Sequence, residues 1–238
     1  MSAIIDFHSH ILPDVDDGSA YLEESLAMLR MEAEQGITRV IATPHFYAQH
    51  DKVESFLQRR EKAANLLREA MSETHGLPQI LVGAEVHFFR GISHTQVLSE
   101  LTIGENQCIL IEMPHSAWTD SMYEELEHIY VKYGITPIIA HIERYIGRFR
   151  TFGIPKRLAE LPVLVQANAS FFVSRSKGAQ ALRMLKKEQI HLLGSDCHDL
   201  HSRKPNLGAA VDRIGAQLGQ AQLEKIVQFQ NLVLDKSL

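Results

Sequence analysis

The sequence predicts an α/β fold, specifically a distorted TIM-like (β/α)7 barrel with its functional site at the carboxyl ends of the strands. Short β-rich runs alternate with amphipathic stretches along the chain, a pattern typical of repeated strand–helix units. These runs are almost continuously apolar, as expected for parallel strands buried on both faces. The length of 238 residues is close to that of a single α/β barrel. An open, doubly wound sheet is the alternative architecture.

The predicted elements follow one another as about seven strand–helix units. The strand-like runs are residues 3–7, 38–45, 79–85, 108–114, 136–143, 162–169 and 190–196. The helix-like stretches between them include residues 21–36, 52–73, 120–134 and 178–189. In the first of these helices, Leu22, Leu26 and Leu29 recur at helical spacing and Gly36 supplies a stop signal. The final segment, residues 206–234, is helical and partly apolar, and either closes the barrel or supports self-association.

Composition and charge limit the class of protein. With 45% hydrophobic and 22% charged residues, the chain has the make-up of an ordinary globular protein. Its formal net charge of -5 offers no basic stripe for nucleic acid or for a membrane surface. A phosphate-bearing substrate therefore requires a locally positive site. We expect one domain that spans residues 1–238.

Cysteine usage and hydropathy predict a cytoplasmic location. The two cysteines, Cys108 and Cys197, lie far apart, which indicates a reducing compartment rather than a disulfide framework. No apolar run approaches the roughly 18 to 20 residues needed to span a bilayer, so we expect no membrane insertion. The first strand begins too close to Met1 to leave room for a secretion signal.

Side chains of metal-ligand type follow six of the seven predicted strands. They are His8 and His10, then His45, Glu85, Glu112, His141, and finally Asp196 and His198. A single H-x-H pair is a weak motif, and one such residue at a strand end is usually a satisfied histidine or a capping acid. In a parallel barrel, however, the carboxyl ends of all strands meet at one face. Agreement among six strands therefore predicts one metal centre.

The order of these motifs resembles the PHP family, named for polymerase and histidinol phosphatase. The segments DFHSHILPDVDDG, GITRVIATPH, GAE, IEMP, IIAHIERY and GSDCH are most similar to the CpsB/CapC-type manganese-dependent tyrosine phosphatases of bacterial capsule synthesis. The matching elements run from residue 5 to about residue 203, although no single motif is decisive. The resemblance implies a PHP-type catalytic domain.

The resemblance also implies three divalent metal ions and nine ligands. His8, His10, Glu85 and Asp196 would hold the first ion; Glu85 would bridge to a second, completed by Glu112 and His141; Asp17, His45 and His198 would hold the third. Asp17 is chosen over Asp16 because it immediately precedes Gly18, as in the family pattern. Asp14 and Asp16 are then turn formers or partners of the ligands. Imidazoles and carboxylates without thiolates suit Mn, Fe or Zn, and the family implies manganese.

Two arginines match positions at which the family binds phosphate. Arg144 and Arg203 carry planar guanidinium groups that can each bind two phosphate oxygens. Our hypothesis is that bridged metals activate water for direct attack on phosphorus. A phenol leaving group, with a pKa near 10, reduces the need for a strong general acid. Asp199 or His201 could supply a proton, but we expect both to be solvated loop residues.

The remaining aromatic and histidine side chains divide into two groups. Tyr47, His50 and His115 follow predicted strands on the active face and are candidate substrate contacts, whereas Trp118 near the same rim is expected to be buried. Histidines in helix-like or loop segments are expected to be surface or packing residues. They are His75, His94, His128 and His191.

Competing functions give different expectations. Residues 197–203 read C-x5-R, the signature of thiolate-based tyrosine phosphatases, but the segment lacks glycine and carries Asp199, which would repel phosphate. Hydrolysis of histidinol phosphate or another small phosphomonoester would keep the metal site, as would the nuclease activity of polymerase-linked members. A non-catalytic metal-binding module would bind metal without turnover.

The resemblance to the CpsB/CapC-type phosphatases also implies a partner. This partner is an autophosphorylated bacterial tyrosine kinase that drives capsule or exopolysaccharide export.

Overall fold

The computed structural model of the protein describes residues 4–104, 107–147 and 153–235. Within these residues the strands are β1 (Ile4–Ser9), β2 (Ile37–Ala42), β3 (His45–Phe46), β4 (Gln79–Val82), β5 (Glu85–His87), β6 (Cys108–Glu112), β7 (Thr136–Ile139), β8 (Leu164–Asn168) and β9 (Leu192–Gly194). The α-helices are α1 (Leu22–Glu34), α2 (Val53–Ser72), α3 (Asp120–Tyr133), α4 (Ile154–Leu158), α5 (Ala169–Val173), α6 (Gly178–Lys186), α7 (Leu207–Leu218) and α8 (Gln220–Leu234). Short 3₁₀ turns cover Ile92–His94, Gln96–Glu100 and Ile142–Arg144.

The strands form a curled parallel sheet. It consists of two parts, a three-stranded sheet with the strand order β1-β2-β4 and a six-stranded sheet with the strand order β3-β5-β6-β7-β8-β9. The two parts are continuous, because β2 and β3 are separated only by Thr43 and Pro44, and β4 and β5 only by Gly83 and Ala84. Across these gaps Gly83 N–H donates to the carbonyl of Ala42 (2.9 Å), and Glu85 N–H donates to the carbonyl of Pro44 (3.0 Å). Proline has no N–H to donate, which accounts for the interruption.

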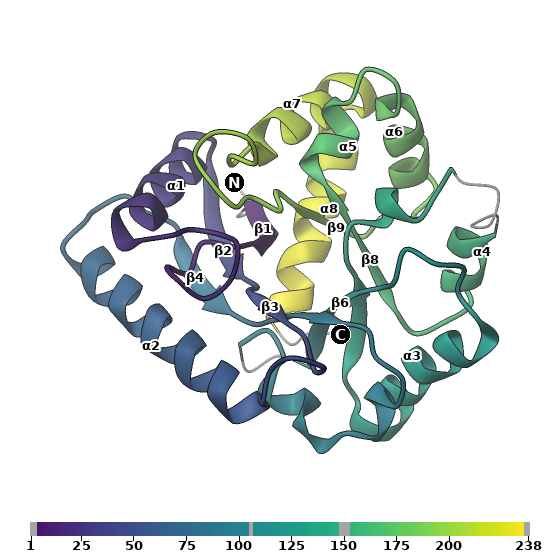
Figure 1. Cartoon of the computed structure of the whole chain (residues 1–238). Coiled ribbons are helices and arrows are strands. Elements are labelled where there is room, and N and C mark those ends of the chain that lie inside the picture. Colours follow the sequence, from purple (N-terminus) through teal and green to yellow (C-terminus); the bar gives the residue numbers. More distant parts are fainter. Residues whose placement is uncertain (1–3, 105–106, 148–152, 236–238) are drawn as a thin grey trace.

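The curl brings the first strand against the segment that follows β9. Asp196 N–H donates to the carbonyl of His8 at 2.7 Å, and His10 N–H donates to the carbonyl of Cys197 at 2.9 Å. Ser9 and Cys197 form a parallel bridge. The end of β1 and the segment after β9 therefore lie side by side near the centre of Figure 1, although almost 190 residues separate them in the sequence.

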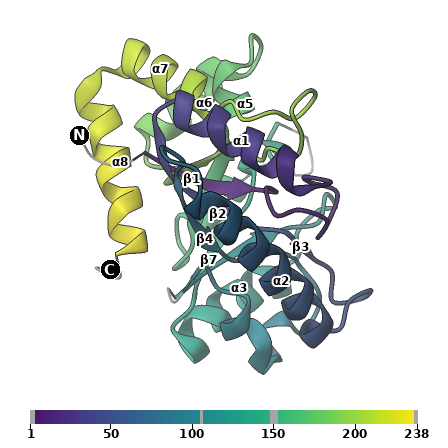
Figure 2. The same ribbon diagram turned by 90° about the vertical axis from the view of Figure 1, so that its left-hand side faces the viewer.

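Two apolar cores hold this arrangement. The larger one fills the space between the strands and the surrounding helices and includes Phe46, Phe56 and Phe172. The smaller one collects inward-facing residues of the sheet, among them Phe7 and Leu110, together with Val233 of α8. Helix α8 lies across the end of the sheet at which β1 begins (Figure 2). The opposite end, at which β1 finishes, is the end that carries the predicted ligands.

The structure confirms an α/β fold with a parallel sheet and refines the predicted elements. The runs predicted as single strands over residues 38–45 and 79–85 are each divided into two short strands. The segment predicted over residues 206–234 is divided into α7 and α8 at Gly219, whose φ of 86° ends the first helix. Of the first predicted strand, residues 3–7, Ala3 lies outside the described residues. In the described part of the chain, none of the helices has the length and hydropathy that a membrane span requires.

Candidate metal centre

The structure brings together all nine predicted ligand side chains at the carboxyl end of the curled sheet. Four of them belong to strands: His8 to β1, His45 to β3, Glu85 to β5 and Glu112 to β6. The others follow the ends of β1, β7 and β9. The backbones of two of these residues are left-handed, with φ of 34° at His141 and 55° at Asp196. Such a conformation is strained for residues with a Cβ and is found where the surrounding structure enforces it. It indicates that the orientation of these two side chains is fixed by their surroundings.

The carboxylate of Glu85 is the centre of the inner cluster. Its Oε2 lies 3.1 Å from Nε2 of His8, 3.4 Å from Nε2 of His10 and 3.0 Å from Nδ1 of His45. Its Oε1 lies 2.8 Å from Nε2 of His141. Burial disfavours a charged carboxylate, but the surrounding imidazoles outweigh this cost and hold the pKa of Glu85 well below its usual range. Four imidazoles thus surround one buried, ionised carboxylate.

Two further carboxylates complete the inner cluster. Oδ1 of Asp196 lies 3.5 Å from Nε2 of His8 and 3.5 Å from Nε2 of His10. Oε1 of Glu112 lies 3.5 Å from Nε2 of His141. Like Glu85, Asp196 is almost completely buried, and its pKa is held well below its usual range because the nearby imidazoles outweigh the effect of burial. The inner cluster therefore contains three buried carboxylates, those of Glu85, Glu112 and Asp196.

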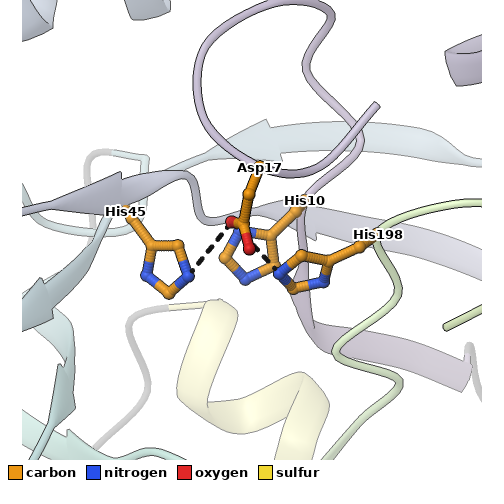
Figure 3. Close-up of side chains that lie close together, drawn as sticks. All are labelled: His10, Asp17, His45 and His198. Atoms are coloured by element: carbon orange, nitrogen blue, oxygen red, sulfur yellow. Dashed lines mark ion pairs between the residues drawn. The ribbon is translucent and has the colours of Figure 1, made fainter. Parts of the chain in front are cut away.

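An outer cluster lies beside the inner one and shares His10 with it. It consists of His10, Asp17, His45 and His198, whose potential ligand atoms all lie within 4.8 Å of one another. Figure 3 shows the Asp17 carboxylate between two imidazoles, and its Oδ1 lies 3.5 Å from Nε2 of both His45 and His198. Asp17 is 66% exposed, so this cluster opens to solvent, in contrast to the inner one.

The ring nitrogens that face away from the clusters are held by protein groups. Nδ1 of His10 lies 2.7 Å from Oδ2 of Asp16, and Nδ1 of His141 lies 3.2 Å from the Tyr145 hydroxyl. Nδ1 of His8 lies 3.4 Å from Oε1 of Gln166. Metal-binding histidines almost always engage their other nitrogen in this way, which fixes both the tautomer and the ring orientation. Asp16 thus contacts a ligand from outside, which is one of the two roles predicted for it.

The residues present fit a metal centre. Three buried ligand-type atoms have no hydrogen-bond partner among the described residues, namely Nδ1 of His45, Oε2 of Glu85 and Nε2 of His198. All three face other ligand atoms inside the clusters. Because an unpaired buried polar atom is costly, this arrangement favours cations that accept lone pairs from several directions. Imidazole and carboxylate ligands without thiolate suit Mn, Fe or Zn.

The two predicted arginines flank Asp196 at the mouth of the site. Nη2 of Arg144 donates to Oδ2 of Asp196 at 2.7 Å, and Nη2 of Arg203 donates to Oδ1 of the same carboxylate at 2.8 Å. Nη1 of Arg144 also donates to Oε1 of Glu112 at 3.1 Å. The two side chains are 31% and 38% exposed, so each guanidinium reaches both the ligands and the solvent.

The predicted substrate contacts lie at the rim, at different distances from the clusters. The half-buried ring of Tyr47 lies 5.3 Å from that of His45 and 5.4 Å from that of His87. His50 is exposed, and its ring is 6.5 Å from that of Tyr47. On the other side, the exposed His115 has its ring 6.0 Å from that of Tyr145.

Three residues of the site carried no prediction. His87 lies two residues beyond Glu85 on the same strand, and its Nδ1 is 3.1 Å from Oε2 of Glu112. That same-face spacing is the signal that could have indicated it. Tyr145 and Gln166 have no such signal, because a tyrosine after a strand and a glutamine within one are ordinary residues. Trp118 is partly buried and packs on Tyr145 at 5.1 Å, close to the expectation for it.

The C-x5-R segment is not arranged for thiolate chemistry. Cys197 is completely buried, and its Sγ lies 4.0 Å from Oε1 of Glu32. Burial, together with the nearby carboxyl groups of Glu32 and Asp6, raises the pKa of this thiol well above its usual range. Asp199 is bound to its own loop, since its Oδ1 accepts from the N–H groups of His201 and Ser202 at 2.6 Å each.

The histidines that were expected to lie outside the site do so. His75, His94 and His128 are exposed on helices or turns. His191 is partly buried, and its Nδ1 accepts from Val165 N–H at 3.0 Å. None of the four occurs in a potential metal-binding group of the described residues.

The fold and the site together place this protein among α/β proteins whose parallel sheet carries a cluster of metal-ligand side chains at its strand ends. A more specific assignment follows from comparison with known proteins. The family model for capsular polysaccharide synthesis proteins CpsB/CapC matches residues 4–233, and the chain belongs to this family.

Named relatives and solved structures agree with this family. The tyrosine-protein phosphatase CpsB of Streptococcus pneumoniae is 30% identical over 239 residues, covering 94% of each chain. The tyrosine-protein phosphatase YwqE of Bacillus subtilis is 30% identical over 208 residues, covering 84% of this chain and 79% of YwqE. A crystal structure from the work on YwqE and CpsB, described as unique metal-dependent tyrosine phosphatases, matches with a TM-score of 0.85 and 25% identity, covering 98% of this chain and 94% of that one.

Proposed function

We propose that this protein is a metal-dependent protein-tyrosine phosphatase. The observation that carries the proposal is the combination of nine converging ligand side chains with two guanidinium groups that flank Asp196 at the mouth of the site. The names of the relatives, tyrosine-protein phosphatases, support the same activity. A phosphate dianion is the natural guest of a site that joins divalent cations to arginines.

In this proposal the two clusters hold three divalent ions, with manganese as the metal. The side chains of His8, His10, Glu85, Asp196, Glu112 and His141 would hold two of the ions, with Glu85 as the shared ligand, and those of Asp17, His45 and His198 would hold the third. The charge of three such ions exceeds that of the four ligand carboxylates. Bound ions of this kind neutralise phosphate charge and lower the pKa of a coordinated water toward neutrality.

The protein's own side chains orient the substrate. Arg144 and Arg203 bind the phosphate oxygens and offset the charge that shifts among them during transfer. Tyr47, His50 and His115 border the path of the substrate side chain. Because a tyrosine phenolate is a good leaving group, the site needs no dedicated acid such as Asp199 to expel it.

The physiological setting is part of the proposal. We propose a cytoplasmic enzyme that dephosphorylates an autophosphorylated bacterial tyrosine kinase of capsule or exopolysaccharide synthesis. We also propose that residues 1–238 form one catalytic domain, and that β2 with β3, and β4 with β5, each count as one strand of a seven-stranded barrel that carries the metal site at its strand ends. The hydrogen bonds of the segment after β9 to β1 support this count.

The test compares substrates on the same metal-stripped protein. Protein treated with EDTA and then resupplied with manganese is assayed on a phosphotyrosine peptide and on histidinol phosphate, beside a Cys197→Ser variant. We expect manganese to restore phosphate release from the peptide in both proteins. A preference for histidinol phosphate would contradict the tyrosine phosphatase assignment. Loss of activity in the serine variant alone would contradict the metal mechanism.

A further inference from the structure

Among the seven predicted strand–helix units, the one that contains β8 is the one without a predicted ligand. β8 nevertheless lies between two strands that lead to ligands. It pairs with β7, which leads to His141, and with β9, which leads to Asp196. Gln166 and Asn168 are two residues apart on β8, so their side chains lie on the same face of the sheet. Both are buried, with Gln166 completely so. A buried amide pair inside the sheet, next to the metal centre, requires a physical explanation.

The hydrogen bonds of this amide pair run from one ligand to the next. The backbone N–H of His141 donates to Oε1 of Gln166 at 2.7 Å, and Nε2 of Gln166 donates to Oδ1 of Asn168 at 2.9 Å. Nδ2 of Asn168 then donates to Oδ2 of Asp196 at 2.8 Å. His141 and Asp196 are the two ligand residues with left-handed backbones. The pair thus connects the two strained positions across β8.

Gln166 also fixes the tautomer of a third ligand. Its Oε1 lies 3.4 Å from Nδ1 of His8, and its amide cannot be flipped, because the N–H of His141 requires an acceptor at that position. A carbonyl oxygen only accepts, so the proton of a neutral His8 ring lies on Nδ1. The lone pair of Nε2 then faces Glu85 and Asp196.

The neighbouring strand leaves space for this amide. A Cβ at Gly194 would lie 2.7 Å from Nε2 of Gln166 and 2.7 Å from Cβ of His8, closer than real Cβ contacts. Only glycine fits between the two side chains without displacing one of them. The arrangement therefore involves three neighbouring strands, β8, β9 and β1, rather than one side chain alone.

We propose that Gln166 is a positioning residue of the metal centre, which together with Asn168 holds His8, His141 and Asp196 in the orientation required to bind metal. This inference rests on the proposed metal centre but not on the identity of the substrate. Outer partners of metal ligands typically change metal affinity by about 10- to 100-fold when they are replaced.

The test measures Mn²⁺ affinity by competition with a chelator, without substrate, together with unfolding of the metal-free protein. Gln166→Leu removes the acceptor and the donor at nearly constant volume. The matched control is Gln230→Leu, since Gln230 is equally buried but lies on α8, where its Nε2 donates to the carbonyl of Ile5 at 3.4 Å. Gln166→Glu keeps the acceptor for the N–H of His141 but loses the donor to Asn168, and it serves as the partial-rescue variant.

We expect Gln166→Leu to bind Mn²⁺ about 10- to 100-fold more weakly than wild type, and Gln166→Glu to recover the part of the loss that depends on the acceptor. Gln230→Leu should lower the stability of the metal-free protein while leaving Mn²⁺ affinity unchanged. Equal Mn²⁺ affinity in Gln166→Leu and wild type would overturn the inference, as would a Gln166→Glu protein as weak as the leucine variant.

A second variant covers the case in which Gln166→Leu does not fold. Asn168→Ala removes the hydrogen bond from Nδ2 of Asn168 to Oδ2 of Asp196. We expect Mn²⁺ affinity to fall roughly 10-fold in this variant. Wild-type affinity in this variant would overturn the role of the pair. A wild-type protein that binds Mn²⁺ but does not hydrolyse phosphotyrosine would refute the proposed function, while the comparison of affinities would still decide the role of Gln166.

Discussion

Nε2 of His8 and Nε2 of His10 lie 3.1 Å apart, and both face Oε2 of Glu85. His8 belongs to β1 and His10 follows one residue after its end, so both side chains point to the same side. Each holds its other ring nitrogen against a protein group, Gln166 for the first and Asp16 for the second. Both lone pairs are therefore directed toward one small region. A cation is the partner that satisfies two such nitrogens and a carboxylate at once.

Metal should therefore stabilise the folded protein. We expect the melting temperature to rise when manganese is added to EDTA-treated protein, because the ion binds the assembled site and not the unfolded chain. A free concentration 100 times the dissociation constant corresponds to about 2.7 kcal/mol at one site. Differential scanning calorimetry across a manganese series measures this. A His141→Ala protein should respond less, and an unchanged melting temperature in wild type would contradict the metal centre.

Asp16→Asn should weaken metal binding although Asp16 is not a proposed ligand. The change removes the charge beside Nδ1 of His10, and we expect Mn²⁺ affinity to fall by about 10-fold or more. The matched control is Asp14→Asn, since Asp14 is exposed in the same loop and asparagine tolerates its φ of 57°. Equal affinities in the two variants, measured by chelator competition, would show that Asp16 merely shapes the loop.

The affinity for metal should rise with pH. Burial disfavours the His10 imidazolium, but the charge and hydrogen bond of Asp16 outweigh burial and raise the pKa of His10 well above its usual range. Manganese must displace this proton, so affinity grows as the pH rises toward the raised pKa. Titrations between about pH 6 and pH 8 should show the increase, and Asp16→Asn should flatten it. A pH-independent affinity in wild type would argue against a protonated His10.

Removing either arginine should impair turnover even when manganese is saturating. For Arg144→Ala and Arg203→Ala we expect kcat/KM on a phosphotyrosine peptide to fall by roughly 10²-fold, because each guanidinium neutralises phosphate charge. Both arginines also donate to Asp196, so Mn²⁺ affinity is measured in parallel and turnover is assayed at saturating manganese. Arg157→Ala is the control, because Arg157 pairs with Asp120 on an exposed surface. Wild-type kinetics in both site variants would exclude the proposed phosphate contacts.

Cys197→Ala should retain turnover. Its thiol is completely buried, and the burial together with Glu32 and Asp6 keeps it protonated at neutral pH. We expect a loss of about 1 kcal/mol in stability at most, and no labelling of Cys197 by iodoacetamide in the native wild-type protein. Loss of activity in a folded Cys197→Ala protein would instead indicate thiolate chemistry.

The sequence predicts that the side chains of the inner cluster lie together, because parallel topology converts order along the chain into proximity. Six of the seven apolar runs lead to a ligand-type residue such as Glu112 or His141, and the carboxyl ends of parallel strands share one edge. Neither secondary structure propensity nor exact element ends are needed for this inference. The division of the predicted strands at Pro44 and Gly83 accordingly leaves the positions of His45 and Glu85 unaffected.

Other parts of the site depend on contacts that no local pattern encodes. Gln166 lies in a mostly apolar run and acts through residues of β1 and β7, so its partners become visible only when the sheet is assembled. The left-handed backbones of His141 and Asp196 also arise from the assembled surroundings rather than from the residue types. Gly219 is a signal for the break between α7 and α8, but both helices are partly apolar, so the pattern over residues 206–234 also fits one continuous helix.

The pairing of β1 with the segment after β9 sets an order of events during synthesis. Seven of the nine proposed ligands precede residue 190, yet the last two, Asp196 and His198, stand in the segment that bonds to His8 and His10. A chain emerging from the ribosome carries its first histidines without their final partners while almost 190 further residues are added. Contacts of such long sequence separation form late, because the intervening loop must first close. The proposed metal centre is therefore a late product of folding, and its occupancy reports that synthesis has passed residue 198.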